Sequence, residues 1–173
     1  PSANALTAAI AADGTLQWQR TVNGSGSGFD QGVSVSPFGG GAFVAGDATE
    51  SGVIRQLLVK YDSGGNATWS RVISNPGSAQ DTVKAVLADG SGDVFVTGTT
   101  RVGGDVNFFT TYVNGVSGNE IWRNVDGTSG GPDVPVAMVR DASNNVYVAG
   151  SSNSAGVESM RVVKYGNSPW QAV

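Results

Sequence analysis

A repeat of about 52 residues constrains the fold of this 173-residue chain more than any other feature of its sequence. A glycine stands four residues before each of the four tryptophans, at Gly14–Trp18, Gly65–Trp69, Gly118–Trp122 and Gly166–Trp170. Three more landmarks recur at spacings of 51 or 52 residues: an aspartate (Asp30, Asp81, Asp133), an aromatic residue (Phe43, Phe95, Tyr147) and a glycine (Gly46, Gly98, Gly150). Repetition at a fixed period indicates supersecondary units that stack on one another.

Each repeat contains four short apolar segments separated by turn residues. The first follows the aspartate (32–36, 82–88, 134–140), the second ends on the glycine (42–46, 93–98, 145–150), the third is 55–61, 107–113 and 159–165, and the fourth carries the tryptophan (67–73, 119–125, 168–173). Strands of this length joined by Gly, Asn and Asp turns form an antiparallel meander. A four-stranded unit with this period predicts an all-β fold built of β-propeller blades.

The repeat boundaries predict about three and a half blades. Residues 29–80, 81–132 and 133–173 form one blade each, and residues 1–28 match only the second half of a blade. Closed propellers have four to eight blades, and a broad apolar face is rarely left exposed. We therefore expect further blades as partners, from the same longer chain or from a second copy.

The repeated anchors have structural explanations in such a fold. We expect the aspartate-led strand to be innermost and the tryptophan strand outermost, where the tryptophan packs on the neighbouring blade. Gly46, Gly98 and Gly150 are expected either to adopt a positive φ or to admit a close neighbouring backbone. The glycine before each tryptophan is expected at a positive-φ turn position.

Composition excludes several classes of function. The chain has 26 glycines, 14% charged residues, a net charge of −4 and neither His nor Cys, so imidazole bases, thiolates, disulfides and cysteine–histidine zinc sites are ruled out. The absence of a basic run argues against nucleic acid, and no apolar stretch reaches the roughly 18 residues of a membrane span. We expect no cofactor. The Gly/Ser/Asn/Thr-rich surface favours an extracellular, cell-surface or periplasmic location.

The anchors resemble the bacterial SBBP-type (seven-bladed β-propeller) repeat family. The resemblance is carried by DASNNVYVAG (141–150), DGSGDVFVTG (89–98), LVKYDSGGNATW (58–69) and VVKYGNSPW (162–170). The chain departs from the pattern where TTYVNG replaces the Val-Lys-Tyr-Asp segment and where SPFGGGAFVAG lacks the turn aspartate. The resemblance implies an exported or surface protein of bacteria, and most such proteins have no assigned activity.

Two turns show oxygen-bearing side chains at alternating positions, as at the start of a calcium loop. These calcium candidates are Asp89, Ser91 and Asp93 in one turn, and Asp141, Ser143 and Asn145 in the other. Neither turn has the following glycine or a glutamate at the twelfth position. Asp, Asn and Ser also occur in turns for their own backbone hydrogen bonds, and we prefer this explanation.

We expect a non-catalytic structural or interaction module of an exported bacterial protein, presenting loops for protein or glycan binding. The expected loops are 47–54, 99–106 and 151–158, with the connections 23–28, 74–80 and 126–132 beside them. Binding residues often lie on loops over a rigid frame. The charged candidates are Asp47, Glu50, Arg101, Asp105, Asp126 and Glu158.

The alternative is a fragment of a propeller enzyme, either glycosidase- or sialidase-like or quinoprotein dehydrogenase-like. The hairpin 112–122 is similar to repeats of quinoprotein dehydrogenases, but no acidic cluster matches their cofactor and calcium ligands. The carboxylates are scattered along the chain, and no catalytic residue is assigned.

Overall fold

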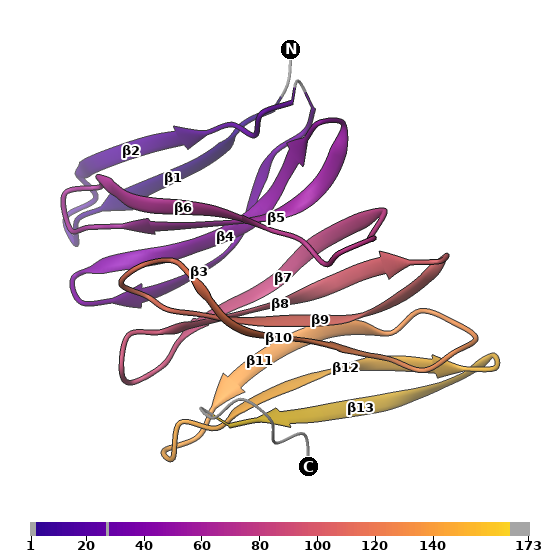
Figure 1. The fold of residues 1–173 in the computed structure, drawn as a ribbon. Coiled ribbons are helices and arrows are strands. Elements are labelled where there is room, and N and C mark those ends of the chain that lie inside the picture. Colours follow the sequence, from indigo (N-terminus) through magenta and orange to yellow (C-terminus); the bar gives the residue numbers. More distant parts are fainter. Residues whose placement is uncertain (1–2, 27, 167–173) are drawn as a thin grey trace.

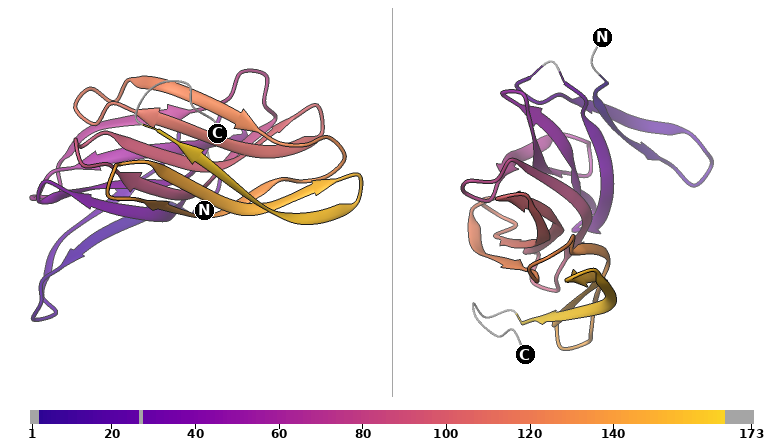
Figure 2. Two further views of the ribbon diagram at one scale, coloured as in Figure 1. Left: turned by 90° about the horizontal axis from the view of Figure 1, so that it is seen from below. Right: turned by 90° about the vertical axis from the view of Figure 1, so that its right-hand side faces the viewer.

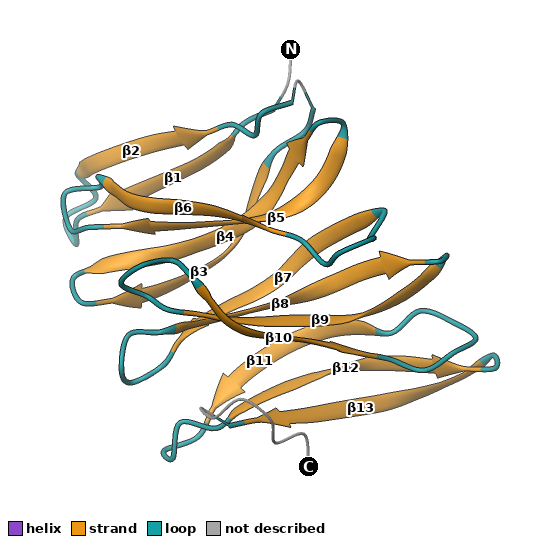
Figure 3. Cartoon of the chain, in the orientation of Figure 1, coloured by secondary structure: helices purple, strands orange, loops and turns teal. Residues whose placement is uncertain are grey.

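The chain is all β in the computed structural model, which describes residues 3–26 and 28–166. Thirteen antiparallel strands form four sheets, and these residues contain no helix (Figure 3). The expected all-β class is confirmed. No helix of the described ranges could therefore cross a membrane.

The four sheets follow one another along the chain (Figure 1). Sheet A is the hairpin β1 (Ala5–Ile10) and β2 (Leu16–Val22). Sheet B contains β3 (Gln31–Phe38), β4 (Gly41–Glu50), β5 (Val53–Tyr61) and β6 (Ala67–Ile73). Sheet C contains β7 (Gln80–Ala88), β8 (Val94–Val102), β9 (Asp105–Val113) and β10 (Glu120–Asp126). Sheet D contains β11 (Val134–Arg140), β12 (Val146–Ser154) and β13 (Val157–Tyr165). The predicted strand 168–173 lies outside the described residues.

Strand order within each sheet equals chain order, so every connection inside a sheet is a hairpin. The first strand of each larger sheet has its register shift at the same place, between Gly32 and Ser34, between Val83 and Ala85, and between Pro135 and Ala137. The first strands of neighbouring sheets, β3 and β7 and then β7 and β11, approach one another. The right-hand view of Figure 2 shows the sheets layered one after another, with sheets A and D at opposite ends of the stack.

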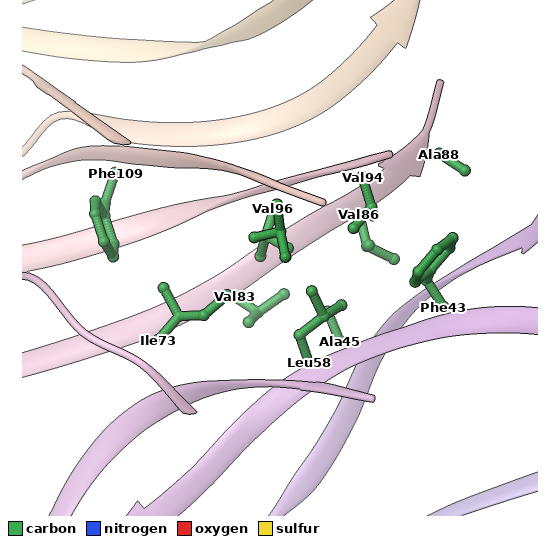
Figure 4. Packing of buried hydrophobic residues seen from close by; sticks show 11 residues of the cluster. Phe43, Ala45, Leu58, Ile73, Val83, Val86, Ala88, Val94, Val96 and Phe109 are labelled. Carbon is green, nitrogen blue, oxygen red and sulfur yellow. The ribbon is translucent and has the colours of Figure 1, made fainter. Parts of the chain in front are cut away.

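Each gap between sheets holds its own apolar core. Leu57 and Tyr61 of sheet B face Trp18 and Val22 of sheet A. The largest core joins sheets B and C and includes Phe43, Leu58, Val94, Val96 and Phe109 (Figure 4). The third joins the aromatic residues of sheet C, such as Phe95 and Phe108, to Val146 and Val148 of sheet D. Burial between the sheets is thus the main apolar driving force of the fold.

The repeated glycines do two different things. Gly46, Gly98 and Gly150 have ordinary φ angles, and a Cβ on any of them would collide with a backbone carbonyl of the adjacent first strand. The close-approach alternative is therefore the correct one for these three. Gly65 and Gly118 adopt the expected positive φ of 77° and 72°.

Candidate functional site

The connections of the sheets gather at two opposite ends, which we call the hairpin end and the turn end. At the hairpin end, the segment before each first strand lies against the tip of the hairpin that joins the second and third strands of the same sheet, which we call a β4–β5-type hairpin. Ser25 bonds to Glu50, the Ala79 N–H donates to the Arg101 carbonyl, and Gly130 lies against Ala155. At the turn end, the other turns touch across sheets, as Gly92 touches Phe38.

The predicted loops at the hairpin end are much shorter than expected. Most of residues 47–54, 99–106 and 151–158 continue the strands, and only two residues form each turn. Both turn residues have positive φ in all three cases, namely Ser51–Gly52, Gly103–Gly104 and Ala155–Gly156. This is the type I′ geometry that matches the twist of paired strands. The hairpin end is therefore a set of regular β-ribbons.

Three of the six predicted charged residues are exposed on these ribbons. Arg101 and Asp105 flank the turn of the β8–β9 hairpin, and Glu158 follows the turn of the β12–β13 hairpin. Arg101 donates to the Gly104 carbonyl at 3.2 Å, which curls its guanidinium over its own turn. These side chains can reach a partner.

The other three predicted charges are engaged within the molecule. Asp47 is buried, with 7% of its surface exposed, and its carboxylate is bonded within the B/C core. Glu50 accepts hydrogen bonds from the backbone and hydroxyl of Ser25. Asp126 pairs with Arg161 across sheets C and D. Prediction from sequence could not separate these from the exposed group, because all six stand near turn residues in similar contexts.

The repeated aspartates are almost completely buried and tie the hairpin end together. Asp30, Asp81 and Asp133 have only 2%, 0% and 0% of their surfaces exposed. Each carboxylate accepts at least one hydrogen bond from the connection before it and at least one from the second strand of its own sheet. The donors are Gly24 and Thr49 for Asp30, Asn75 and Thr100 for Asp81, and Thr128 and Asn153 for Asp133. Several bonds to one buried carboxylate are what its burial requires.

A polar seam between sheets B and C was not predicted. Side chains of sheet B bond to the outward backbone edge of β7: Ser34 accepts from the Val86 N–H at 3.1 Å, Ser36 from Ala88 at 2.9 Å, and Asp47 from Val83 at 2.7 Å. Gln56 donates to the Thr82 carbonyl at 2.8 Å, and Arg55 pairs with Asp81 at 2.7 Å. The seam satisfies backbone groups that a strand edge leaves without a ladder partner.

A second feature is a set of hydrogen bonds from the tryptophan strand to a turn of the next sheet, which we call the tryptophan grip. The sequence predicted packing of the tryptophan but not these bonds. Trp18 Nε1 donates to the Ser63 carbonyl, and Arg20 donates to Gly64 in the same turn. Trp69 Nε1 donates likewise to the Gly115 carbonyl. Arg71, two residues after Trp69, donates to the carbonyls of Ser117 and Gly118. The sequence signal was present as Trp-x-Arg, which occurs at both 18–20 and 69–71.

The glycine of each gripped turn makes room for the tryptophan ring. A Cβ on Gly118 would lie 2.9 Å from Trp69 Cδ2, and one on Gly65 would collide with the Trp18 ring. The glycine and tryptophan of a Gly-x-x-x-Trp motif therefore serve different contacts in sheets B and C, because Gly65 and Gly118 each pack on the tryptophan of the preceding repeat.

The calcium-candidate turns are organised by their own hydrogen bonds. Asp89 Oδ1 accepts from the N–H groups of Ser91, Gly92 and Asp93, and Oδ2 accepts from the Tyr112 hydroxyl at 2.7 Å. Burial alone would raise the pKa of Asp89, but the hydrogen bonds from Tyr112 and Ser91 outweigh it and lower that pKa. Burial, together with the hydrogen bond to Asp89, raises the pKa of Tyr112.

The second candidate turn repeats this arrangement at the surface. Asp141 Oδ1 accepts from the backbone of Ser143 and Asn145, and Oδ2 accepts from the Asn145 side chain at 2.7 Å. These hydrogen bonds, led by that from the Asn145 side chain, lower the pKa of Asp141. No group of three or more Asp or Glu side chains close enough to hold a metal ion occurs within residues 3–26 and 28–166. The geometry is that of aspartate-capped turns.

The exposed side of sheet D carries a shallow, open depression of about 580 Å³, lined by Val136, Ala149, Glu158 and Met160 among others. Its lining is mainly apolar, and none of the polar residues given as its lining, Ser151, Glu158 and Ser159, is buried. Comparison of the sequence with models of protein families and with curated proteins finds no match.

Proposed function

We propose that the chain is a run of β-propeller blades of the SBBP type that acts as a non-catalytic scaffold in an exported bacterial protein. The strand order of sheets B and C, with each sheet a four-stranded antiparallel meander, supports this assignment. So does the recurrence of the same register shift in each first strand.

The observation that carries the scaffold function is the division of the acidic side chains into two sets. The buried carboxylates, such as Asp47, Asp81 and Asp89, accept hydrogen bonds that hold strands, turns and sheets in place. Exposed charges stand at the tips of the hairpins. A frame stabilised in this way presents its ribbons rigidly, which reduces the conformational entropy lost when a partner binds.

The binding surface is the hairpin end, and its contact residues are Arg101, Asp105 and Glu158. Both signs of charge occur there together with the backbone groups of β-ribbon turns. This chemistry suits a polar partner, either a protein surface or a glycan rich in hydroxyl groups.

The test applies the labelled chain to a glycan microarray and to a peptide array. The triple variant R101A/D105A/E158A should lose about tenfold or more in signal, because a loss of about 1.4 kcal/mol of binding free energy over the three positions lowers the affinity tenfold. The matched control is S63A/V116A/S143A, three exposed residues at the turn end, and its binding should be unchanged.

Loss of binding in the control with none in the triple variant would move the site to the turn end. Turnover of a glycoside or of a quinone-dependent substrate by the purified chain would replace the scaffold function with the propeller-enzyme alternative.

A further inference from the structure

Two apolar faces at opposite ends of the sheet stack are exposed. The face of sheet D that points away from sheet C exposes Val139 (61%), Met160 (84%) and Val162 (54%). The face of sheet A that points away from sheet B exposes Leu6 (60%) and Ile10 (58%). Apolar groups gathered on one face are rarely left in water and usually mark an interaction surface.

The sheet D face is the repeat counterpart of faces that are covered inside the molecule. Met160 pairs with Ser151 in the ladder, as Phe108 pairs with Thr99 and Gln56 with Asp47. Phe108 and Gln56 are both fully buried against the next sheet. Met160 thus occupies a position that is covered in the other two repeats.

The sheet A face is the counterpart of the opposite side of such a contact. Ile10 comes directly after the register shift of its strand, and so does Tyr61 in sheet B, which aligns these two residues. Four residues earlier, Leu6 is then aligned with Leu57. Leu57 and Tyr61 are buried, with 8% and 2% of their surfaces exposed, because sheet A covers them. Sheet A therefore offers the side that a preceding sheet would cover.

The sheet D face also carries the donor, and sheet A the acceptor, for a hydrogen bond of the kind that joins sheets B and C. Lys60 Nζ lies 5.3 Å from the Phe43 ring centroid and donates to the Gly115 carbonyl of the next sheet at 2.6 Å. On sheet D, Lys164 Nζ lies 5.6 Å from the Tyr147 ring centroid in the same arrangement. If Lys164 makes the same hydrogen bond as Lys60, its acceptor is a backbone carbonyl on the turn of a following sheet.

The turn of sheet A has the features of such an acceptor. The turn of residues 11–15 has two backbone hydrogen bonds, Ala11 N–H to the Thr15 carbonyl and Gly14 N–H to the Ala11 carbonyl. The turns after the third strands of sheets B and C have the same two bonds, which aligns Ala12 with Ser63 and Gly115. Gly14 has a φ of 86°, and a Cβ placed on it would have no atom within 4 Å, whereas Gly65 and Gly118 have a tryptophan ring there. The adjacent Asp13 is exposed and can face the positive charge of Lys164.

We propose that copies of this chain associate head to tail, with the outer face of sheet D in one copy covering the outer face of sheet A in the next. Lys164 Nζ then donates to the Ala12 carbonyl of the neighbouring copy. Val162, the repeat counterpart of Leu58, packs on Leu6 and Ile10, because Leu58 packs with their counterparts Phe109 and Val113 inside the molecule. The occupant is a second copy because both complementary faces lie on one chain and reproduce the part of an internal contact that the third and fourth strands of a sheet make. Such a contact joins unlike surfaces, so it builds rings or open chains.

The test measures molar mass by sedimentation velocity over a range of concentrations. The unmodified chain should form dimers and larger species as concentration rises. Val162→Asp on sheet D and Ile10→Asp on sheet A should each weaken association by about tenfold or more, as expected for central interface positions. Val116→Asp is the matched control, since Val116 is also an exposed valine (84%) but lies in a turn outside both faces.

Mixing the two variants gives the decisive result. Each keeps one intact face, so the mixture should form a 1:1 dimer that neither variant forms alone. Circular dichroism and thermal unfolding of each variant verify that both remain folded.

Three outcomes would overturn the proposal. The unmodified chain could stay monomeric at every concentration, which would assign the two faces to additional repeats. Either variant alone could associate like the unmodified chain, or the mixture could fail to form the dimer.

Discussion

The contact between sheets B and C and the contact between sheets C and D both contain an apolar core, but they differ in what lies beside that core. At the B/C junction, polar side chains such as Ser34, Asp47 and Gln56 bond to the edge of β7. At the C/D junction, the ladder places Ala85, Thr99 and Phe108 at the corresponding positions. The core of the C/D contact is richer in aromatic residues, with Phe95, Tyr112 and Trp122 in one cluster and Trp122 5.3 Å from Tyr165 between ring centroids.

This difference shows that the repeat conserves spacing and burial rather than a particular bond. Polar seams and apolar cores both satisfy the requirement that a buried surface have partners. Their responses to mutation differ, however. Removing one partner of a buried polar contact leaves a group unsatisfied, whereas truncating an aromatic side chain leaves a cavity.

The largest expected effect is at the apolar C/D junction. Phe108→Ala removes a ring that has 0% exposure and should cost about 3–5 kcal/mol of unfolding free energy, measured by urea denaturation. Met160→Ala is the matched control at the same repeat position on the exposed face of sheet D. Under conditions where the chain is monomeric, it should cost less than about 0.5 kcal/mol. Similar losses for both would mean that the exposed face of sheet D is covered.

The second prediction compares two buried aspartates of the repeat. Asp81 accepts from Arg55, whereas the ladder position of Arg55 is occupied by Asn107 in the next repeat, beside Asp133. Asp81→Ala leaves the partly buried guanidinium of Arg55 without its anionic partner and should cost about 3–5 kcal/mol of unfolding free energy. Asp133→Ala should cost about 1–3 kcal/mol, because it leaves only neutral donors unsatisfied.

A double-mutant cycle with Arg55→Ala isolates the ionic part of the first loss. The coupling between positions 55 and 81 should be about 1 kcal/mol or more. A coupling near zero, or equal losses for the two aspartates, would show that the ion pair adds nothing to the B/C junction.

The third prediction concerns the tryptophan grip at the outer edge of the B/C junction. Gly118→Ala introduces a Cβ 2.9 Å from the Trp69 ring at a φ of 72°, so it combines backbone strain with displacement of the ring. We expect a loss of about 2–3 kcal/mol and a change in tryptophan fluorescence. Gly103→Ala, with a φ of 60° and open space, should lose only about 1 kcal/mol. Equal losses would attribute the whole effect at position 118 to φ.

Strand positions and most turn glycines could be predicted from the sequence because they depend on local periodicity. The β4–β5-type turns were missed although Gly52, Gly104 and Gly156 recur every 52 residues, since the residue before each glycine varies. The seam could not be predicted. A bond such as Ser34 to the Val86 N–H depends on how two separate sheets are offset, and local sequence does not encode that offset.

The same limit applies to the candidate site. Asp47 and Asp105 both stand close to a turn at the hairpin end, yet the first is buried against β7 and the second is exposed. Only the position of the neighbouring sheet separates them.

The smallest expected effect tests whether the polar seam is needed for stability. Gln56 is fully buried, and its Oε1 atom has no hydrogen-bond partner among the described residues. Gln56→Met keeps the length of the side chain, removes that unsatisfied acceptor and loses the bond from Nε2 to the Thr82 carbonyl. The two effects have opposite signs and similar size, so the unfolding free energy should change by less than about 1 kcal/mol.

Gln56→Ala is the control, and it should cost about 2 kcal/mol or more because it leaves a cavity. A loss of that size for Gln56→Met would show that the bond to Thr82 stabilises the B/C junction in a way that apolar packing cannot replace. The two junctions would then differ in their stabilising interactions as well as in residue type.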